Sequence, residues 1–206
     1  MDHRPNYQSE ITKRIDAFAY GEAFSAKDFM DISDANATNQ SLFRLEKEKK
    51  IRRVLTGIYD KPAYSALIHE YSVPRIDKVA EALARRFHWT IAPAGDTALN
   101  LLHISTQVPN EWEYVSDGPY RSYQIGKTTL RFRHVMPREI NGYSAITILV
   151  IQALRAIGRD RLTQDQLRLF SAVLKEKDKT TLLKESQLAS DWIVQAAKRI
   201  CEEKKA

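Results

Sequence analysis

The alternation of apolar and polar positions predicts a helix with two different faces between residues 36 and 49. Thr38, Leu42 and Leu45 recur at i, i+4 and i+7, which is one stripe of a 3.6-residue period. The opposite positions carry amides, cations and one aromatic ring: Asn36, Asn39, Gln40, Phe43, Arg44 and Lys47. The break at Ser33-Asp34 supplies side-chain oxygens that can cap the start of this helix.

The elements on either side of this helix form a recognisable order. Residues 9–24 predict a helix, and residues 26–32 predict a short one with Phe29 and Met30 turned inward. After the central helix, two short strands are expected on either side of Thr56-Gly57. Helix, short helix, polar-faced helix and hairpin is the order of a winged helix-turn-helix.

Between residues 111 and 135 the apolar period changes to two, which predicts strands. Gly126-Lys127 is a two-residue hairpin signal that would pair Tyr123 with Leu130 and Arg121 with Phe132. One side of the hairpin is then expected to face a core: Tyr123, Ile125, Leu130, Phe132 and His134. The other side is either an ordinary solvated face or an effector surface that contacts phosphate or RNA, with candidate residues Gln124, Arg131 and Arg133.

The rest of the chain reads as helical, and the sequence predicts an α+β protein. Helices with an inward apolar stripe are expected over residues 74–87, 144–157, 163–174 and 187–203, and residues 175–184 are a linker or a short helix. We expect a winged helix-turn-helix domain in residues 1–62. Residues 63–206 are expected to form a small mixed or antiparallel sheet packed with helices, with a helical C-terminus.

The charge of the chain is concentrated in the predicted DNA-facing region. The 206 residues carry a net charge of +6, which favours a polyanionic partner, although membranes and acidic proteins are attracted by the same field. Between Arg44 and Arg53 there are six basic residues against two glutamates. Amides can pair with adenine and guanidinium groups with guanine in a major groove, and Arg52 and Arg53 on the hairpin would meet phosphates. A polar helix face is also an ordinary solvated surface, so the order of the elements carries this interpretation.

Motifs for catalysis and cofactor binding are missing from the sequence. There is no glycine-rich phosphate loop or nucleophile elbow, and no two of the five histidines stand at metal-ligand spacing. We therefore expect no enzymatic activity, no cofactor and no metal. The single Cys201, the polar first residues and an apolar run at 145–154 that is too short for a bilayer suggest a cytoplasmic protein without a membrane partner.

Three segments in order resemble the AbiEi-type antitoxin family, which comprises bacterial abortive-infection antitoxins, and an allied uncharacterised family. They are SLFRLEKEKKIRRVLTGIYDKP, VAEALARRFHWTIAPAGDTALNLLHISTQVP and YVSDGPYRSYQIGKTTLRFRHV. Relatives commonly have glycine between the recognition helix and the wing, whereas this chain has Lys49 or Lys50 there. Glycine adopts a positive φ at little cost and lysine does not, which puts the geometry of the wing in question.

The resemblance implies the antitoxin of a type IV toxin–antitoxin system. Its winged helix would repress its own operon by binding inverted repeats in double-stranded DNA. Its C-terminal domain would counter a nucleotidyltransferase toxin without forming a stable complex. The family's DNA contacts would fall on Asn39, Gln40, Arg44 and Lys47 in the helix and on Arg52, Arg53 and Tyr59 in the wing.

Two alternatives to an antitoxin stay open from the sequence. One is a plain winged-helix transcriptional regulator whose second domain dimerises or binds a ligand. The other is an RNA-binding or nucleic-acid-binding factor that uses the basic hairpin.

Overall fold

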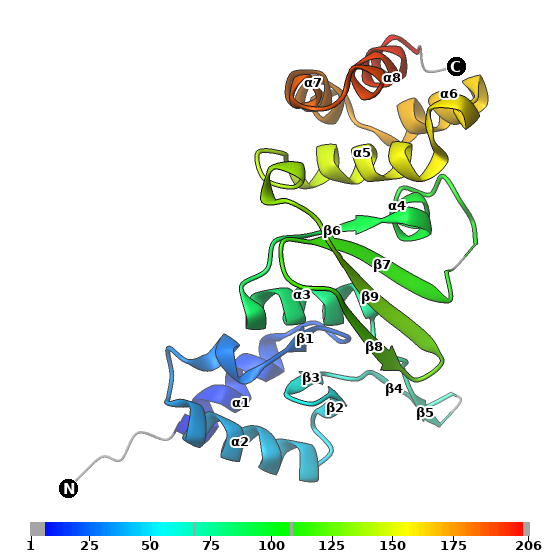
Figure 1. Cartoon of the computed structure of the whole chain (residues 1–206). Coiled ribbons are helices and arrows are strands. Elements are labelled where there is room, and N and C mark those ends of the chain that lie inside the picture. Colours follow the sequence, from blue (N-terminus) through cyan, green and yellow to red (C-terminus); the bar gives the residue numbers. More distant parts are fainter. Residues whose placement is uncertain (1–6, 68, 108, 204–206) are drawn as a thin grey trace, which may run out of the picture. The chain divides into compact units, whose positions relative to one another are not determined.

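The structure, a computed structural model, describes residues 7–67, 69–107 and 109–203, and these form an α+β protein (Figure 1). The class predicted from the sequence is therefore confirmed. The chain divides into two compact units, Met1–Trp89 and Thr90–Ala206. Within the described ranges, no helix is long and apolar enough to cross a membrane.

The first unit combines helices with a three-stranded antiparallel sheet and a separate two-stranded hairpin. The sheet has the order β1-β3-β2, and β4 pairs with β5. The elements in chain order are α1 (Tyr7–Ala17), β1 (Ala23–Phe24), the 3₁₀ turn η1 (Ala26–Phe29), α2 (Ala35–Lys47), β2 (Arg52–Leu55), β3 (Ile58–Asp60), β4 (Tyr64–Ser65), β5 (Glu70–Tyr71) and α3 (Ile76–Phe87).

An aromatic and aliphatic core holds α1, α2 and the sheet together. The inward positions of α2 are buried as predicted, with Leu42 and Leu45 packed against Phe24 and Phe29 in one cluster. The rings of Phe24 and Phe29 meet edge to face at 5.6 Å. Met30 does not join this core and is 50% exposed, because η1 ends at Phe29.

The two ends of α2 are both defined by local chemistry. At the start, Asp34 Oδ1 accepts a hydrogen bond of 2.9 Å from the backbone N–H of Ala37, which is the cap expected from the sequence. After the helix, Lys49 has φ 60°, in the left-handed region. The helix therefore ends at Lys47, two residues before the predicted end, and the chain turns into β2 at Lys49.

Helix α3 belongs to the first unit, although the sequence placed the domain boundary between residues 62 and 63. Arg85 donates to Asp28 Oδ1 at 2.7 Å and to the carbonyl of Ala23 at 2.8 Å. Arg86 donates to the carbonyl of Thr56, at the tip of the β2–β3 hairpin, at 2.6 Å. The unit ends at Trp89 because α3 packs on β1, β3 and η1.

The second unit has a mixed four-stranded sheet covered by helices. Its strand order is β6-β7-β9-β8, in which β7 and β9 run parallel and the other pairs are antiparallel. Its elements are β6 (Ile91–Ala94), α4 (Gly95–Leu101), β7 (Glu111–Ser116), β8 (Arg121–Ile125), β9 (Thr128–His134), η2 (Pro137–Glu139), α5 (Ala145–Ile157), η3 (Arg159–Arg161), α6 (Gln164–Val173), α7 (Glu176–Glu185), η4 (Ser186–Leu188) and α8 (Asp191–Glu202).

Helix α5 lies between the sheet and the last three helices of the second unit (Figure 1). On its sheet side, Ile148 packs with Ala92 and Val115. On its other side, Ile151 and Leu154 join a cluster built with α6, α7 and α8. The apolar helix predicted over residues 144–157 is thus the central layer of this unit. The stretch left open as a linker or a short helix is α7.

Candidate functional site

The outward face of α2 gathers the side chains that the sequence assigned to DNA reading. The following residues are all exposed: Asn36, Asn39, Gln40, Arg44 and Lys47. The opposite face is buried in the core through Thr38, Leu42 and Leu45. The amphipathic period therefore places the whole polar set on one solvent-facing surface.

Two cations on this face have defined neighbours. Arg44 Nη1 donates to Gln8 Oε1 of α1 at 2.7 Å, and this bond uses only one nitrogen of its guanidinium group. Lys47 Nζ lies 4.6 Å from the ring centroid of Phe43, within cation–π distance. Both charges are thereby positioned and still reach solvent.

Arg52 is committed to a buried carboxylate, although the sequence assigned it to phosphates. It pairs with Asp60 across the β2–β3 hairpin, through Nε to Oδ1 at 3.0 Å and Nη2 to Oδ2 at 2.5 Å. Its remaining nitrogen, Nη1, donates to the carbonyl of Ser72 at 2.7 Å. Asp60 is 0% exposed, and a buried carboxylate needs such a partner. The first role of Arg52 is therefore structural.

Arg53 connects the hairpin with α2. Its Nη2 donates to Glu46 Oε2 at 2.8 Å and to the Tyr59 hydroxyl at 3.3 Å. The neighbouring Tyr59, and then Glu46, raise the pKa of the Arg53 guanidinium against the opposing effect of burial, so this group stays charged. Arg53 remains exposed, so its guanidinium group can still reach a ligand.

Tyr59 is a core residue, and its expected position as a wing contact is wrong. It is only 5% exposed, and its ring stacks on Phe24 with centroids 6.3 Å apart. All three residues of β3 are buried, and Tyr59 meets Arg53 both through its hydroxyl and through its ring, whose centroid lies 5.5 Å from the Arg53 guanidinium carbon.

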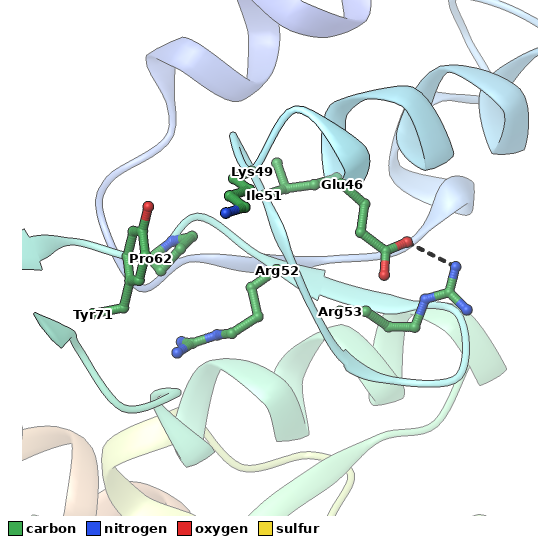
Figure 2. A pocket seen from close by; sticks show the side chains of 7 residues that line it. All are labelled: Glu46, Lys49, Ile51, Arg52, Arg53, Pro62 and Tyr71. Carbon is green, nitrogen blue, oxygen red and sulfur yellow. Dashed lines mark hydrogen bonds and ion pairs between the residues drawn. The ribbon is translucent and has the colours of Figure 1, made fainter.

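A pocket of about 330 Å³ opens beside the end of α2 (Figure 2). Its walls come from α2, from the turn after it, from β2 and from the segment that follows β3. Among the side chains that line it are Lys49, Arg52, Arg53, Pro62 and Tyr71. Sequence reasoning missed this site because Tyr71 comes from a hairpin that the apolar pattern did not predict.

In the second unit, the predicted hairpin forms with its predicted register. Tyr123 lies opposite Leu130 and Arg121 opposite Phe132. Ile125, Leu130 and Phe132 are buried as expected. His134 is not a core residue, because it lies at the end of β9, where it is exposed and hydrogen-bonds to the carbonyl of Gly118 at 2.9 Å.

The candidate effector surface on this hairpin is charge-balanced. Arg131 pairs with Glu111 at 2.8 Å and Arg133 with Glu113 at 2.9 Å, both across the parallel β7–β9 pair. Gln124 donates to the carbonyl of Gly126 at 2.9 Å. Because each arginine faces a glutamate, the surface is mixed in charge and lacks the excess of cations that a polyanion prefers.

Two features of the described part of the chain bear on metal binding and nucleophilic chemistry. There, no cluster of three or more His, Cys, Asp or Glu side chains could hold a metal ion. Burial raises the pKa of the Cys201 thiol, which disfavours the reactive thiolate.

The fold and this surface define an α+β protein with a solvent-facing polar helix next to a basic hairpin. The chain belongs to the DUF6088 family, a family of unknown function, which matches residues 10–182. No curated protein matches the sequence. The matched residues include the helix, the hairpin, the pocket and most of the second unit.

Proposed function

We propose that this protein reads DNA sequence through a winged helix-turn-helix in its first unit, with α2 as the recognition helix and the β2–β3 hairpin as the wing. The observation that carries the proposal is the solvent-facing set of Asn39, Gln40 and Arg44 on α2, together with the exposed Arg53 of the hairpin, which bonds to Glu46 of the same helix. The order α1, β1, η1, α2, β2, β3 supports it, with η1 as a first helix shortened to one 3₁₀ turn.

The contacts divide the proposed DNA surface into readers and anchors. Gln40 and Arg44 are readers, because an amide or a guanidinium group can make two hydrogen bonds to one base. Lys47 and Arg53 are anchors, because a cation beside the groove neutralises phosphates whatever the sequence. Arg52 is left out of both groups, since its removal would also leave the Asp60 carboxylate without its partner.

The resemblance to AbiEi-type antitoxins extends the proposal to the whole chain. The protein is then the antitoxin of a type IV system, represses its own operon at inverted repeats and counters a nucleotidyltransferase toxin through its second unit without a stable complex. The mixed-charge surface with Gln124, Arg131 and Arg133 supports a protein-facing role for the hairpin more than an RNA-facing one.

A plain ligand-regulated transcriptional regulator is the second candidate. The observation that favours it is the 330 Å³ pocket, whose size suits a small molecule. A nucleotidyltransferase gene beside the gene for this protein would favour the antitoxin instead.

The test is binding of the purified protein to the DNA upstream of its own gene and to a scrambled duplex, at two salt concentrations. Gln40→Ala or Arg44→Ala should each remove roughly 1–3 kcal/mol of discrimination between the duplexes. Lys47→Ala or Arg53→Ala should weaken binding to both duplexes alike and reduce the salt slope by about one.

Arg138→Ala is the matched control, since Arg138 is an exposed arginine of η2 in the second unit and its loss changes the net charge equally. This variant should bind both duplexes like the unmodified protein. Equal, salt-sensitive binding of both duplexes would contradict sequence reading, and identical behaviour of readers and anchors would contradict the division between them.

A further inference from the structure

We propose that the pocket beside the end of α2 binds a small anion that carries a planar ring, of the nucleoside monophosphate class. The ligand site itself goes beyond the proposed function. Its effect on DNA, described below, rests on that function.

Two flat apolar surfaces form one side of the pocket, from Pro62 and Tyr71 (Figure 2). The ring of Tyr71 is held by an edge contact with the ring of Tyr64, with centroids 5.1 Å apart, and by the β4–β5 pairing. The bond from Arg52 to the carbonyl of Ser72 ties the adjacent backbone to the hairpin. Tyr71 is still 49% exposed, so a planar ring can stack on it.

The other side of the pocket has an uncompensated positive charge. Three cations line it, Lys49, Arg52 and Arg53, and two carboxylates pair with them, Asp60 with Arg52 and Glu46 with Arg53. Three positive charges and two negative charges give this group a net charge of +1. Lys49 supplies it, because its ammonium group has no acceptor within the described residues.

The two cations nearest the apolar walls can both donate to an anion. The positive φ of Lys49 sets the direction in which its side chain leaves the turn between α2 and β2. Arg52 uses three N–H donors on Asp60 and Ser72, which leaves roughly two of the five that a guanidinium group has. A phosphate or carboxylate is therefore favoured over a neutral polar group.

Size and composition together indicate the ligand class. A volume of about 330 Å³ lies at the lower end of small-molecule pockets, which span roughly 300–1,000 Å³. The site thus suits one planar ring system with one anionic group. A nucleoside monophosphate combines both features, with its base on Tyr71 and its phosphate between Lys49 and Arg52.

Such a ligand would act against DNA binding in the proposed winged helix. Arg53 lines the pocket and is also the proposed anchor in the wing, so a bound phosphate would reduce the positive potential that attracts the DNA backbone. Linkage is reciprocal, so DNA would weaken ligand binding by the same factor.

The experiment is calorimetric titration of the full chain, without DNA, with AMP, UMP, adenosine and inorganic phosphate. AMP should bind more tightly than adenosine, which lacks the phosphate, and more tightly than inorganic phosphate, which lacks the ring. The difference in affinity between AMP and UMP measures how much the identity of the base contributes. Lys49→Gln should weaken AMP binding by roughly tenfold or more and leave adenosine binding unchanged. Tyr71→Ala should weaken AMP and adenosine binding by roughly tenfold and leave phosphate binding unchanged.

Lys50→Gln is the matched control, because Lys50 is the next lysine along the chain, pairs with Glu48 and does not line the pocket. No AMP or UMP binding, or AMP binding that is unaffected by both Lys49→Gln and Tyr71→Ala, would overturn the ligand site. Upstream-DNA binding that stays unchanged at saturating AMP would overturn only the regulatory effect. Failure of DNA binding with intact AMP binding would overturn the proposed function and leave the ligand site standing.

Discussion

Lys49 adopts a left-handed backbone conformation that glycine usually adopts. It ends the turn after α2 with φ 60°, where the Cβ of an L-residue crowds the backbone. The resemblance to AbiEi-type antitoxins, which commonly have glycine here, pointed to either Lys49 or Lys50. The structure decides between the two, since Lys50 is not among the described residues with positive φ.

The free energy of unfolding should respond to residue 49 in both directions. Lys49→Gly should raise it by up to about 1 kcal/mol, because glycine relieves the left-handed strain but gains entropy in the unfolded chain. Lys49→Val should lower it by roughly 1–3 kcal/mol, since a β-branched residue tolerates this conformation poorly. Urea denaturation measures both changes.

A glycine substitution at Lys50 distinguishes the effect of backbone strain at residue 49 from the effect of losing a lysine charge. Lys50→Gly removes the same charge at a position without positive φ, so it should lower the free energy of unfolding by roughly 0.5–1 kcal/mol. Equal effects of glycine at both positions would show that the turn is not strained at Lys49.

Single residues show where sequence reasoning succeeded and where it ended. The exposure of Gln40 and Arg44 was predictable, because a helical period needs only neighbours along the chain. The roles of Arg52 and Tyr59 were not. Asp60 accepts hydrogen bonds from Arg52 only because β2 and β3 pair in one particular register. A strand of three residues is too short for its sequence pattern to predict which side chains are buried.

Among the elements, long helices were predicted and very short strands were missed. The residues of α5 follow an unmistakable apolar pattern between Ser144 and Gly158, which cap its two ends. By contrast β1, β4 and β5 have two residues each, so they carry no period at all. The predicted helix over residues 9–24 consequently ran through β1, whereas α1 ends at Ala17.

Helix α7 is tied to the start of α5 by one carboxylate. Glu185 Oε2 accepts from the backbone N–H and from the hydroxyl of Ser144, both at 2.8 Å. Burial acts to raise the pKa of Glu185, but hydrogen bonds from Thr147 and Ser144 outweigh it and hold the pKa below its ordinary value of 4.5. Folding therefore favours the ionised form.

The sign of the resulting pH dependence follows from this depressed pKa. The stabilisation by Glu185 is fully present above pH 4.5, the ordinary value that applies in the unfolded chain, and is lost as the pH falls through the lower folded value. Glu185→Gln should cost about 1 kcal/mol at neutral pH, a modest amount because solvent screens this carboxylate. Urea midpoints measured from neutral pH downward should converge for the two proteins in acid.

Glu202→Gln on α8 provides the comparison, since Glu202 is exposed and its substitution removes the same charge. Its midpoints should follow those of the unmodified protein at every pH. A constant difference between Glu185→Gln and the unmodified protein, independent of pH, would mean that the ionisation of Glu185 does not contribute.

For the whole molecule, the largest difference from the sequence prediction is the extent of the first unit. The boundary was expected after residue 62, because Lys61-Pro62 closes the predicted wing. The compact unit reaches Trp89, since Arg85 and Arg86 of α3 close onto η1, β1 and the tip of the β2–β3 hairpin. These contacts span 30 residues or more, beyond what a local pattern can indicate.

This extent can be tested by cutting the chain. A fragment of residues 1–89 should unfold cooperatively on heating, as followed by circular dichroism, because it keeps α3. A fragment of residues 1–62 should show no cooperative transition, or one at a much lower temperature. Equal transitions in the two fragments would show that α3 is dispensable to the first unit.

The strand order of the second unit also indicates the order in which its strands pair during folding. The β8–β9 hairpin closes through a two-residue turn, so it can assemble as soon as both strands have left the ribosome. Its docking onto β7 must close a longer loop, because β8 lies between the two parallel strands along the chain and at the edge of the sheet in space. We therefore expect the parallel β7–β9 contact to form after the β8–β9 hairpin.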